Sequence, residues 1–176
     1  MNELLERHNH RHRLALGITI VWLAAVVMAF WWFSARFIVP FSETLVHFDG
    51  DILPPQMNSS SLNRVTIVTV IDPDCPCSGF AEGHWDELIN RYPNVAFARA
   101  TESNEWRGLH EQVASSPAVA IWDSDGLLRY FGPFSGGAFC GSGDDYVAMA
   151  LDAMASDENF KWINQDAVGC FCQRNG

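Results

Sequence analysis

Several signatures of common enzyme classes are missing from this chain. It contains no G-x-S-x-G segment of the kind that carries a nucleophilic serine, no phosphate-binding glycine loop and no H-E-x-x-H zinc motif. It also contains no internal repeats. These absences argue against serine hydrolase, nucleotide-binding and metalloprotease mechanisms, so the chemistry has to be carried by other residues.

Positive charge is scarce over most of the chain. Residues 34–176 contain eight Lys and Arg residues against nineteen Asp and Glu residues, which gives a formal charge of −11. Because phosphate binding depends on basic patches, this composition argues against nucleic acid as a partner. It equally disfavours docking of this part of the chain on anionic lipid.

Charge is absent altogether from one stretch near the N-terminus. Residues 14–33, "LALGITIVWLAAVVMAFWWF", form a run of 20 residues in which only Thr19 is polar. As a helix the run is about 30 Å long, which matches the hydrocarbon core of a bilayer. A cleaved signal peptide has an apolar region of only ~7–15 residues and a small-residue cleavage site. We therefore expect an uncleaved transmembrane anchor that ends in interfacial tryptophans.

The flanks of this anchor predict its orientation. Arg7, Arg11 and Arg13 precede it, whereas only Arg36 follows closely. The positive-inside rule then predicts a single-pass protein of the inner (plasma) membrane with residues 1–13 as a cytoplasmic basic tail. The periplasmic or otherwise extracytoplasmic part comprises a Pro- and Ser-rich tether at 34–63, a domain at 64–156 and a cysteine-containing tail at 157–176.

Regular patterns within residues 64–156 predict an α/β domain. Short runs rich in Val and Ile alternate with segments of helical periodicity, and "DSDG" between two of the strands is a hairpin signal. The predicted strands cover 64–71, 94–100, 118–122 and 127–131, and the predicted helices cover 78–91, 104–113 and 144–155. This order predicts a mixed sheet with helices on both faces.

Cysteine does not occur in the first 74 residues, and all five cysteines lie in the predicted exported part, where disulfides are stable. Cys75 and Cys77 stand one residue apart in "VTIVTVIDPDCPCSGF", where a strand gives way to a helix. A disulfide between them would close almost no loop and would be a poor structural staple. A helix N-terminus stabilises a thiolate, although Asp72 and Asp74 oppose this effect. The pair is better suited to electron exchange or to soft-metal binding.

This junction and "SSPAVAIWDSDGLLRYFG" about forty residues later resemble the thioredoxin family. The resemblance covers roughly residues 64–156 and is strongest to the membrane-tethered, TlpA-like branch, in particular to bacterial thioredoxin-like proteins with a "DPDCPC" centre. It implies a thioredoxin-like mixed sheet in which a cis Pro117 faces the cysteines. It also implies a thiol–disulfide oxidoreductase, without a cofactor, that acts on the thiols or disulfides of exported proteins.

The resemblance also implies residue roles. Thioredoxins have C-x-x-C, so two registers are possible for the C-x-C segment of this chain. In the register we favour, Cys75 attacks and Cys77 resolves; in the other, Asp74 takes the place of the attacking cysteine. Ser116 and Pro117 would hold the partner chain as an added strand. The buried acidic residue behind the thioredoxin cysteines would fall on Thr69, so that proton acceptor is missing.

Cys140, in a glycine-rich segment, and the tail cysteines Cys170 and Cys172 form a second group. One interpretation is a structural disulfide from Cys140 to Cys170 or Cys172 that ties down a loose tail, and we favour it. The other is a second dithiol that relays electrons to Cys75 and Cys77. Two further hypotheses for the whole protein are a Cu(I) or Zn site built from Cys75, Cys77 and His84, and a redox-inactive interaction module.

Overall fold

The computed structural model describes residues 2–35, 38–41, 64–103, 105–137, 143–157 and 159–174, with side chains of the first helix described from residue 10 to residue 32. The chain divides into two compact units, Met1–Arg36 and Phe37–Gly176.

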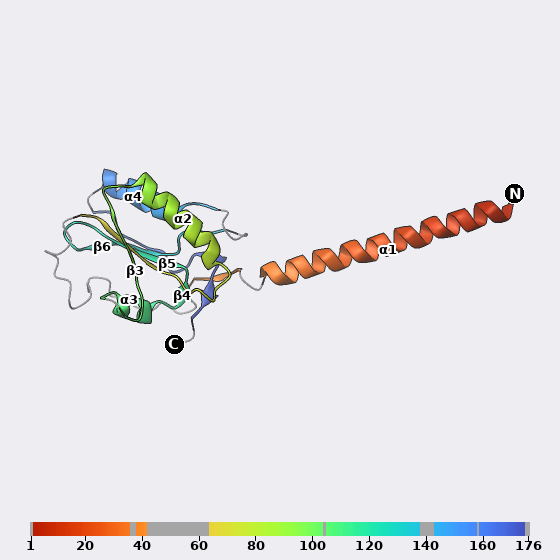
Figure 1. Cartoon of the computed structure of the whole chain (residues 1–176). Helices are drawn as coiled ribbons and strands as arrows, with labels where there is room; N and C mark the ends of the chain where they lie inside the picture. Colours follow the sequence, from red (N-terminus) through yellow and green to blue (C-terminus); the bar gives the residue numbers. More distant parts are fainter. Residues whose placement is uncertain are drawn as a thin grey trace. The chain divides into compact units, whose positions relative to one another are not determined.

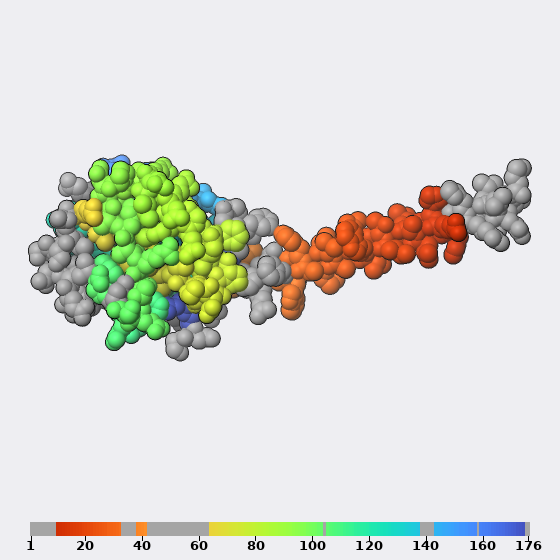
Figure 2. All heavy atoms as spheres, in the orientation of Figure 1, coloured from red at the N-terminus to blue at the C-terminus, as the bar shows by residue number. Residues whose placement is uncertain are grey.

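The first unit is the helix α1, Asn2–Ala35. Its segment His10–Trp32 has a mean hydropathy of 2.3 and is long and apolar enough to cross a membrane. Apolar side chains such as Val21 and Trp32 are largely exposed on it. Figure 2 shows the surface of this helix in red and orange. The predicted apolar anchor at 14–33 therefore lies within one continuous helix, with a surface that suits contact with lipid.

The second unit is built on a five-stranded mixed sheet in the order β3-β2-β5-β6-β7 (Figure 1). β5 is antiparallel to both of its neighbours, whereas β2 pairs with β3, and β6 with β7, in parallel. The strands are β2 Thr66–Val70, β3 Ala96–Arg99, β5 Ala118–Trp122, β6 Leu128–Gly132 and β7 Trp162–Ile163.

Helices cover both faces of this sheet, because successive strand residues point to opposite sides. On one face Ile67 packs with residues of α2, Ser78–Arg91, and α4, Tyr146–Ser156. On the other face Val68 packs with Trp106 and Leu109 at the short helix α3, Arg107–Gln112. Figure 1 shows α2 and α4 together on one side of the sheet and α3 on the other.

The fold is thioredoxin-like, as the resemblance implied. The order of the predicted strands and helices is confirmed, and the Ser116–Pro117 bond is cis. The "DSDG" hairpin forms between β5 and β6: Asp123 Oδ1 accepts hydrogen bonds from the N–H groups of Asp125 and Leu127, both at 2.9 Å. Gly126 has φ +80°, which glycine adopts without steric cost.

Two small sheets extend this unit beyond the predicted domain at 64–156. β1, Ile38–Pro40, pairs antiparallel with β8, Val168–Cys170, and β4, Ser115–Ser116, pairs antiparallel with β9, Cys172–Gln173. Phe41, in the stretch predicted as tether, is buried in the core together with Phe171 of the tail. Residues 42–63 of the predicted tether lie outside the described residues.

Candidate redox centre

Cys75 and Cys77 lie in the turn that connects β2 to α2, as the sequence indicated. The turn is closed by hydrogen bonds from Cys75 N–H to Asp72 O at 3.1 Å and from Ser78 N–H to Cys75 O at 2.9 Å. The Ser78 hydroxyl also donates to Asp72 O. Cys77 is the N-cap residue of α2, and both cysteines are buried, with 4% and 3% of their surface exposed. The two sulfurs are therefore held at the positive end of a 14-residue helix.

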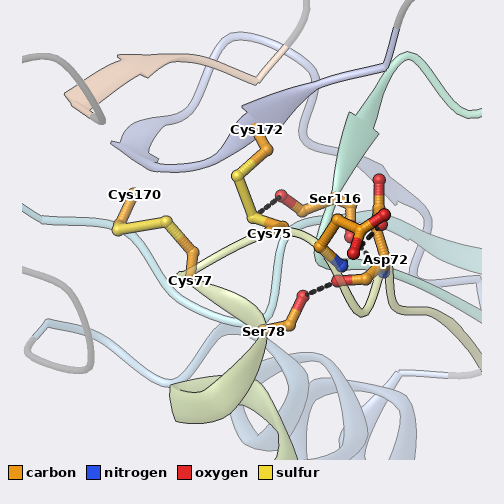
Figure 3. Close-up of a disulfide and its surroundings, with 8 residues drawn as sticks. Asp72, Cys75, Cys77, Ser78, Ser116, Cys170 and Cys172 are labelled. Atoms are coloured by element: carbon orange, nitrogen blue, oxygen red, sulfur yellow. Dashed lines mark hydrogen bonds between the residues drawn. A yellow bond between two sulfur atoms is a disulfide. The ribbon is translucent and has the colours of Figure 1, made fainter.

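The disulfides differ from the pairing that we expected for the tail. Cys75 is bonded to Cys172 and Cys77 to Cys170, with Cα–Cα distances of 5.9 and 6.0 Å (Figure 3). The expected bridge from Cys140 to Cys170 or Cys172 is wrong for this state, and Cys140 itself lies outside the described residues. The physical reason is strand pairing: β8 and β9 bring the tail back over the turn, with Cys172 opposite Ser116.

Ser116 and the cis Pro117 lie next to the bridges, as the resemblance implied. Cys75 Sγ is 3.6 Å from Ser116 O, and Ser116 Oγ accepts a hydrogen bond from Asp72 N–H at 2.8 Å. The backbone of Ser116, where we expected a partner strand, pairs in this state with β9 of the same chain.

Thr69 takes the position behind the cysteines where the resemblance implied a missing acid. Its side chain is fully buried, and its hydroxyl donates to Ala118 O at 3.1 Å. A threonine hydroxyl does not titrate in the physiological range, so this position cannot act as the proton acceptor for a cysteine.

A cavity of about 100 Å³ adjoins one of the two bridges. Both cysteines of the Cys77–Cys170 bridge line it, whereas Cys75 and Cys172 do not. Pro117 forms part of the wall, together with apolar and polar side chains from α2 and from the segment before α4. The other lining residues are Phe80, Ala81, His84, Phe134, Ser135, Gly136, Gly143, Asp145 and Phe171.

His84 and Asp145, which both line this cavity, are in contact with each other. His84 Nε2 lies 3.2 Å from Asp145 Oδ1, and contact with this carboxylate raises the pKa of His84 above its usual value, although burial opposes the shift. Burial favours a raised pKa for Asp145, but the close contact with His84 and the hydrogen bond from Ala148 N–H outweigh it and lower that pKa. Asp145 is also the N-cap of α4 and accepts from Ala148 N–H at 2.8 Å.

The metal hypothesis has a different set of ligands in the structure. Among the described residues, the ligand atoms of Cys75, Cys77 and Cys172 lie within 4.8 Å of one another. His84, which the sequence suggested as the third ligand, is not in this group and pairs with Asp145 instead. Three close sulfurs are the donor type that Cu(I) and Zn prefer when the thiols are reduced.

The joining of the two C-x-C segments is the feature that sequence reasoning missed. The sequence contains a signal for this pairing, because "CPC" and "CFC" have the same spacing. Each cysteine of one segment can therefore form a disulfide with one cysteine of the other. A thioredoxin-like fold with both cysteine pairs in contact supports thiol–disulfide chemistry at this place.

One protein family and several solved structures are similar to this chain. A family model with the description "Domain of unknown function (DUF6436)" matches residues 45–174. No match to a curated protein was found. A conserved protein of Geobacillus kaustophilus is 18% identical over 65% of this chain and 80% of its own, with a TM-score of 0.43. Thioredoxin of Fasciola hepatica is 20% identical over 52% of this chain and 80% of its own, with a TM-score of 0.37. Thioredoxin O2 of Arabidopsis thaliana is 14% identical over 53% of this chain and 75% of its own, with a TM-score of 0.38.

Proposed function

The chain belongs to the DUF6436 family, and for this member we propose a membrane-anchored, exported thiol–disulfide oxidoreductase that exchanges disulfides with other exported proteins. Cys75 and Cys77 form the inner pair of its redox centre, and Cys170 and Cys172 form the outer pair. The observation that carries the proposal is the crosswise bonding of the two pairs, Cys75 to Cys172 and Cys77 to Cys170, beside Pro117.

The position of the inner pair supports electron exchange rather than a purely structural role. The α2 N-terminus favours the thiolate form of Cys75 and Cys77, and a thiolate is the species that attacks and leaves in disulfide exchange. Burial at 4% and 3% exposure limits direct access to both residues. The outer pair therefore passes the disulfide between the inner pair and the partner protein.

The relay step balances within the four cysteines. The Cys75 thiolate attacks Cys172 Sγ of a Cys170–Cys172 disulfide; the Cys75–Cys172 bond forms, and Cys170 leaves as a thiolate. The Cys77 thiolate then attacks Cys75 Sγ, and Cys172 leaves. The inner pair loses two electrons and the outer pair gains two. The crosswise state has two disulfides, Cys75–Cys172 and Cys77–Cys170. It is an isomer of the state with Cys75–Cys77 and Cys170–Cys172 bonds.

Export of the domain is the second part of the proposal. The arginines that precede the apolar run at 14–33, within α1, support a cytoplasmic N-terminus by the positive-inside rule. The domain then faces an oxidising compartment, in which two disulfides persist. Partners are exported proteins with exchangeable thiols or disulfides.

The test uses the purified full chain in detergent, with dithiothreitol as reductant and a disulfide-bonded protein as reporter. Wild type is expected to accelerate reduction of the reporter, and the double substitution Cys75→Ser and Cys77→Ser should return the rate to that of dithiothreitol alone. Cys140→Ser is the matched control, since neither bridge contains this residue, and it should retain the wild-type rate. A wild type no faster than the double variant would refute the redox function and favour an interaction module.

Soft-metal binding is the alternative, and the close approach of three sulfur ligands favours it. In that case the reduced chain would hold Cu(I) or Zn through Cys75, Cys77 and Cys172. Metal analysis of the reduced, anaerobically purified full chain decides between the two functions. Stoichiometric metal that Cys172→Ser abolishes, together with no disulfide exchange, would establish the carrier function.

A further inference from the structure

The strand-docking edge beside Pro117 is occupied by the chain itself. β9 pairs with Ser115 and Ser116, Gln173 Nε2 donates to Pro40 O at 3.0 Å, and Arg174 N–H donates to Ala114 O at 2.7 Å. The Arg174 guanidinium also donates to His110 O in α3. Figure 2 shows the surface of the tail, in dark blue, beside that of α3, in green. A partner strand therefore cannot add to this edge in the oxidised state.

The two bridges differ in their surroundings. In Figure 3 the Cys75–Cys172 bridge lies between Ser116 and the Cys77–Cys170 bridge. Cys75 is packed against Ser116 O, whereas both residues of Cys77–Cys170 line the cavity. Cys77 is buried and Cys170 is partly exposed; Cys172 is partly exposed too, so the two bridges differ in their contact with the cavity and not in the exposure of the outer cysteine. Cys170 therefore offers the sulfur of the Cys77–Cys170 bridge that an incoming group meets more easily.

Resting on the proposed function, we propose that Cys170 is the residue at which a partner dithiol enters the centre, and that the cavity beside it binds an apolar side chain next to the partner cysteine. Phe80 is 55% exposed on the first turn of α2 and lines the cavity together with Phe134 and Phe171. These rings give part of the cavity wall an apolar character, which fits an exported segment with an aliphatic or aromatic residue beside its cysteine.

The position of Cys77 makes attack at Cys170 chemically favourable. A partner thiolate attacks Cys170 Sγ; the partner–Cys170 bond forms, the Cys77–Cys170 bond breaks, and Cys77 leaves as a thiolate. Because Cys77 caps α2, the helix dipole stabilises this leaving group, and a better leaving thiolate speeds exchange. The second thiol of the partner then attacks its own bonded sulfur and releases Cys170. The partner loses two electrons and the bridge gains two.

The first experiment compares two full-length variants in detergent, each with a single bridge. Cys75→Ser with Cys172→Ser leaves Cys77–Cys170, and Cys77→Ser with Cys170→Ser leaves Cys75–Cys172. With dithiothreitol we expect the Cys77–Cys170 bridge to be reduced at least about tenfold faster. Brief exposure of wild type to glutathione should place the first adduct on Cys170. Equal rates, or a first adduct on Cys172 or on an inner cysteine, would overturn the assignment.

The second experiment tests the apolar contact with a synthetic dithiol peptide that carries leucine beside its first cysteine. Phe80→Ala should slow the reaction of this peptide with the full chain but leave the reaction with dithiothreitol unchanged. Ile89→Ala is the matched control, because Ile89 is exposed on the same helix and does not line the cavity. No effect of Phe80→Ala on the peptide would overturn the contact.

The outcomes separate this inference from the proposed function. Turnover of the reporter protein with equal reactivity of the two bridges would leave the oxidoreductase standing and reject Cys170 as the entry residue. Preferential reduction of Cys77–Cys170 without turnover of any reporter would reject the oxidoreductase function. It would still support the inference that an incoming thiol reaches this bridge more easily than Cys75–Cys172.

Discussion

At the scale of single residues, the inner and outer cysteines have different environments although their spacing is the same. Cys75 and Cys77 are buried at a helix N-terminus, whereas Cys170 and Cys172 lie on short strands and are partly exposed. Thiolate stabilisation and access are thus divided between the two pairs. A centre built in this way combines a good leaving group with a reachable sulfur in the same bond.

His84 provides a prediction on pH at the same scale. Contact with Asp145 raises the pKa of His84 in the folded state, so the contact stabilises the fold fully below the unfolded pKa of about 6.5 and is lost as pH rises through the folded pKa. Asp145, with a lowered pKa, stays ionised at pH 5.5. His84→Gln should therefore cost about 0.5–1 kcal/mol at pH 5.5 and less at pH 8, measured by urea unfolding.

His110→Gln is the control for this prediction. Burial and the nearby Arg174 guanidinium lower the pKa of His110, so the charged form is disfavoured in the folded state and stability falls as pH drops below about 6.5. Its replacement should be better tolerated at pH 5.5 than at pH 8. The same pH dependence for both variants would contradict the assignment of the His84–Asp145 contact.

At the scale of helices and strands, the sequence predicts most accurately the elements whose signals are local and extend over at least several residues. The helix predicted at 78–91 and the strand predicted at 118–122 have these bounds in the structure, because apolar spacing and the Tyr92–Pro93 stop are local signals. Strands of two or three residues, such as β4 and β9, have no periodicity to detect. Their pairing depends on contacts between Ser116 and Cys172, which are distant in sequence, and so the sequence does not indicate that the tail pairs with β4.

Phe171 anchors the tail and carries the prediction at this scale. Its side chain is 3% exposed, and its ring packs edge-on against Phe41 at a centroid distance of 5.3 Å. Phe171→Ala should lower the free energy of unfolding by about 3 kcal/mol, because it leaves a cavity in a packed core. The measurement is urea denaturation of the full chain with its disulfides intact.

Val168→Ala is the matched control for Phe171→Ala. Val168 lies in the same tail, on β8, but is 55% exposed. Its replacement should change stability by less than about 0.5 kcal/mol. Equal effects of the two substitutions would mean that the tail does not depend on the packing of Phe171.

At the scale of the whole molecule, the proposed function requires the domain to be outside the cytoplasm. A reporter enzyme that is active only outside the cytoplasm, fused after Gly176, should be active, and the protein should stay in the membrane fraction after alkaline extraction. Replacing Arg7, Arg11 and Arg13 together by glutamine should reduce the reporter signal, because in the proposed topology these residues keep the N-terminus inside. Activity of a cytoplasm-only reporter at the same position would contradict the orientation.

The joining of the two C-x-C segments into one centre is tested most directly by peptide mapping of the oxidised full chain without reduction. Trypsin is expected to release residues 65–91 with Cys75 and Cys77, residues 130–161 with Cys140, and residues 162–174 with Cys170 and Cys172. We predict that peptides 65–91 and 162–174 are joined by two disulfides and separate only on reduction, while Cys140 is in neither bond. A disulfide between peptides 130–161 and 162–174, with peptide 65–91 released alone, would contradict this prediction.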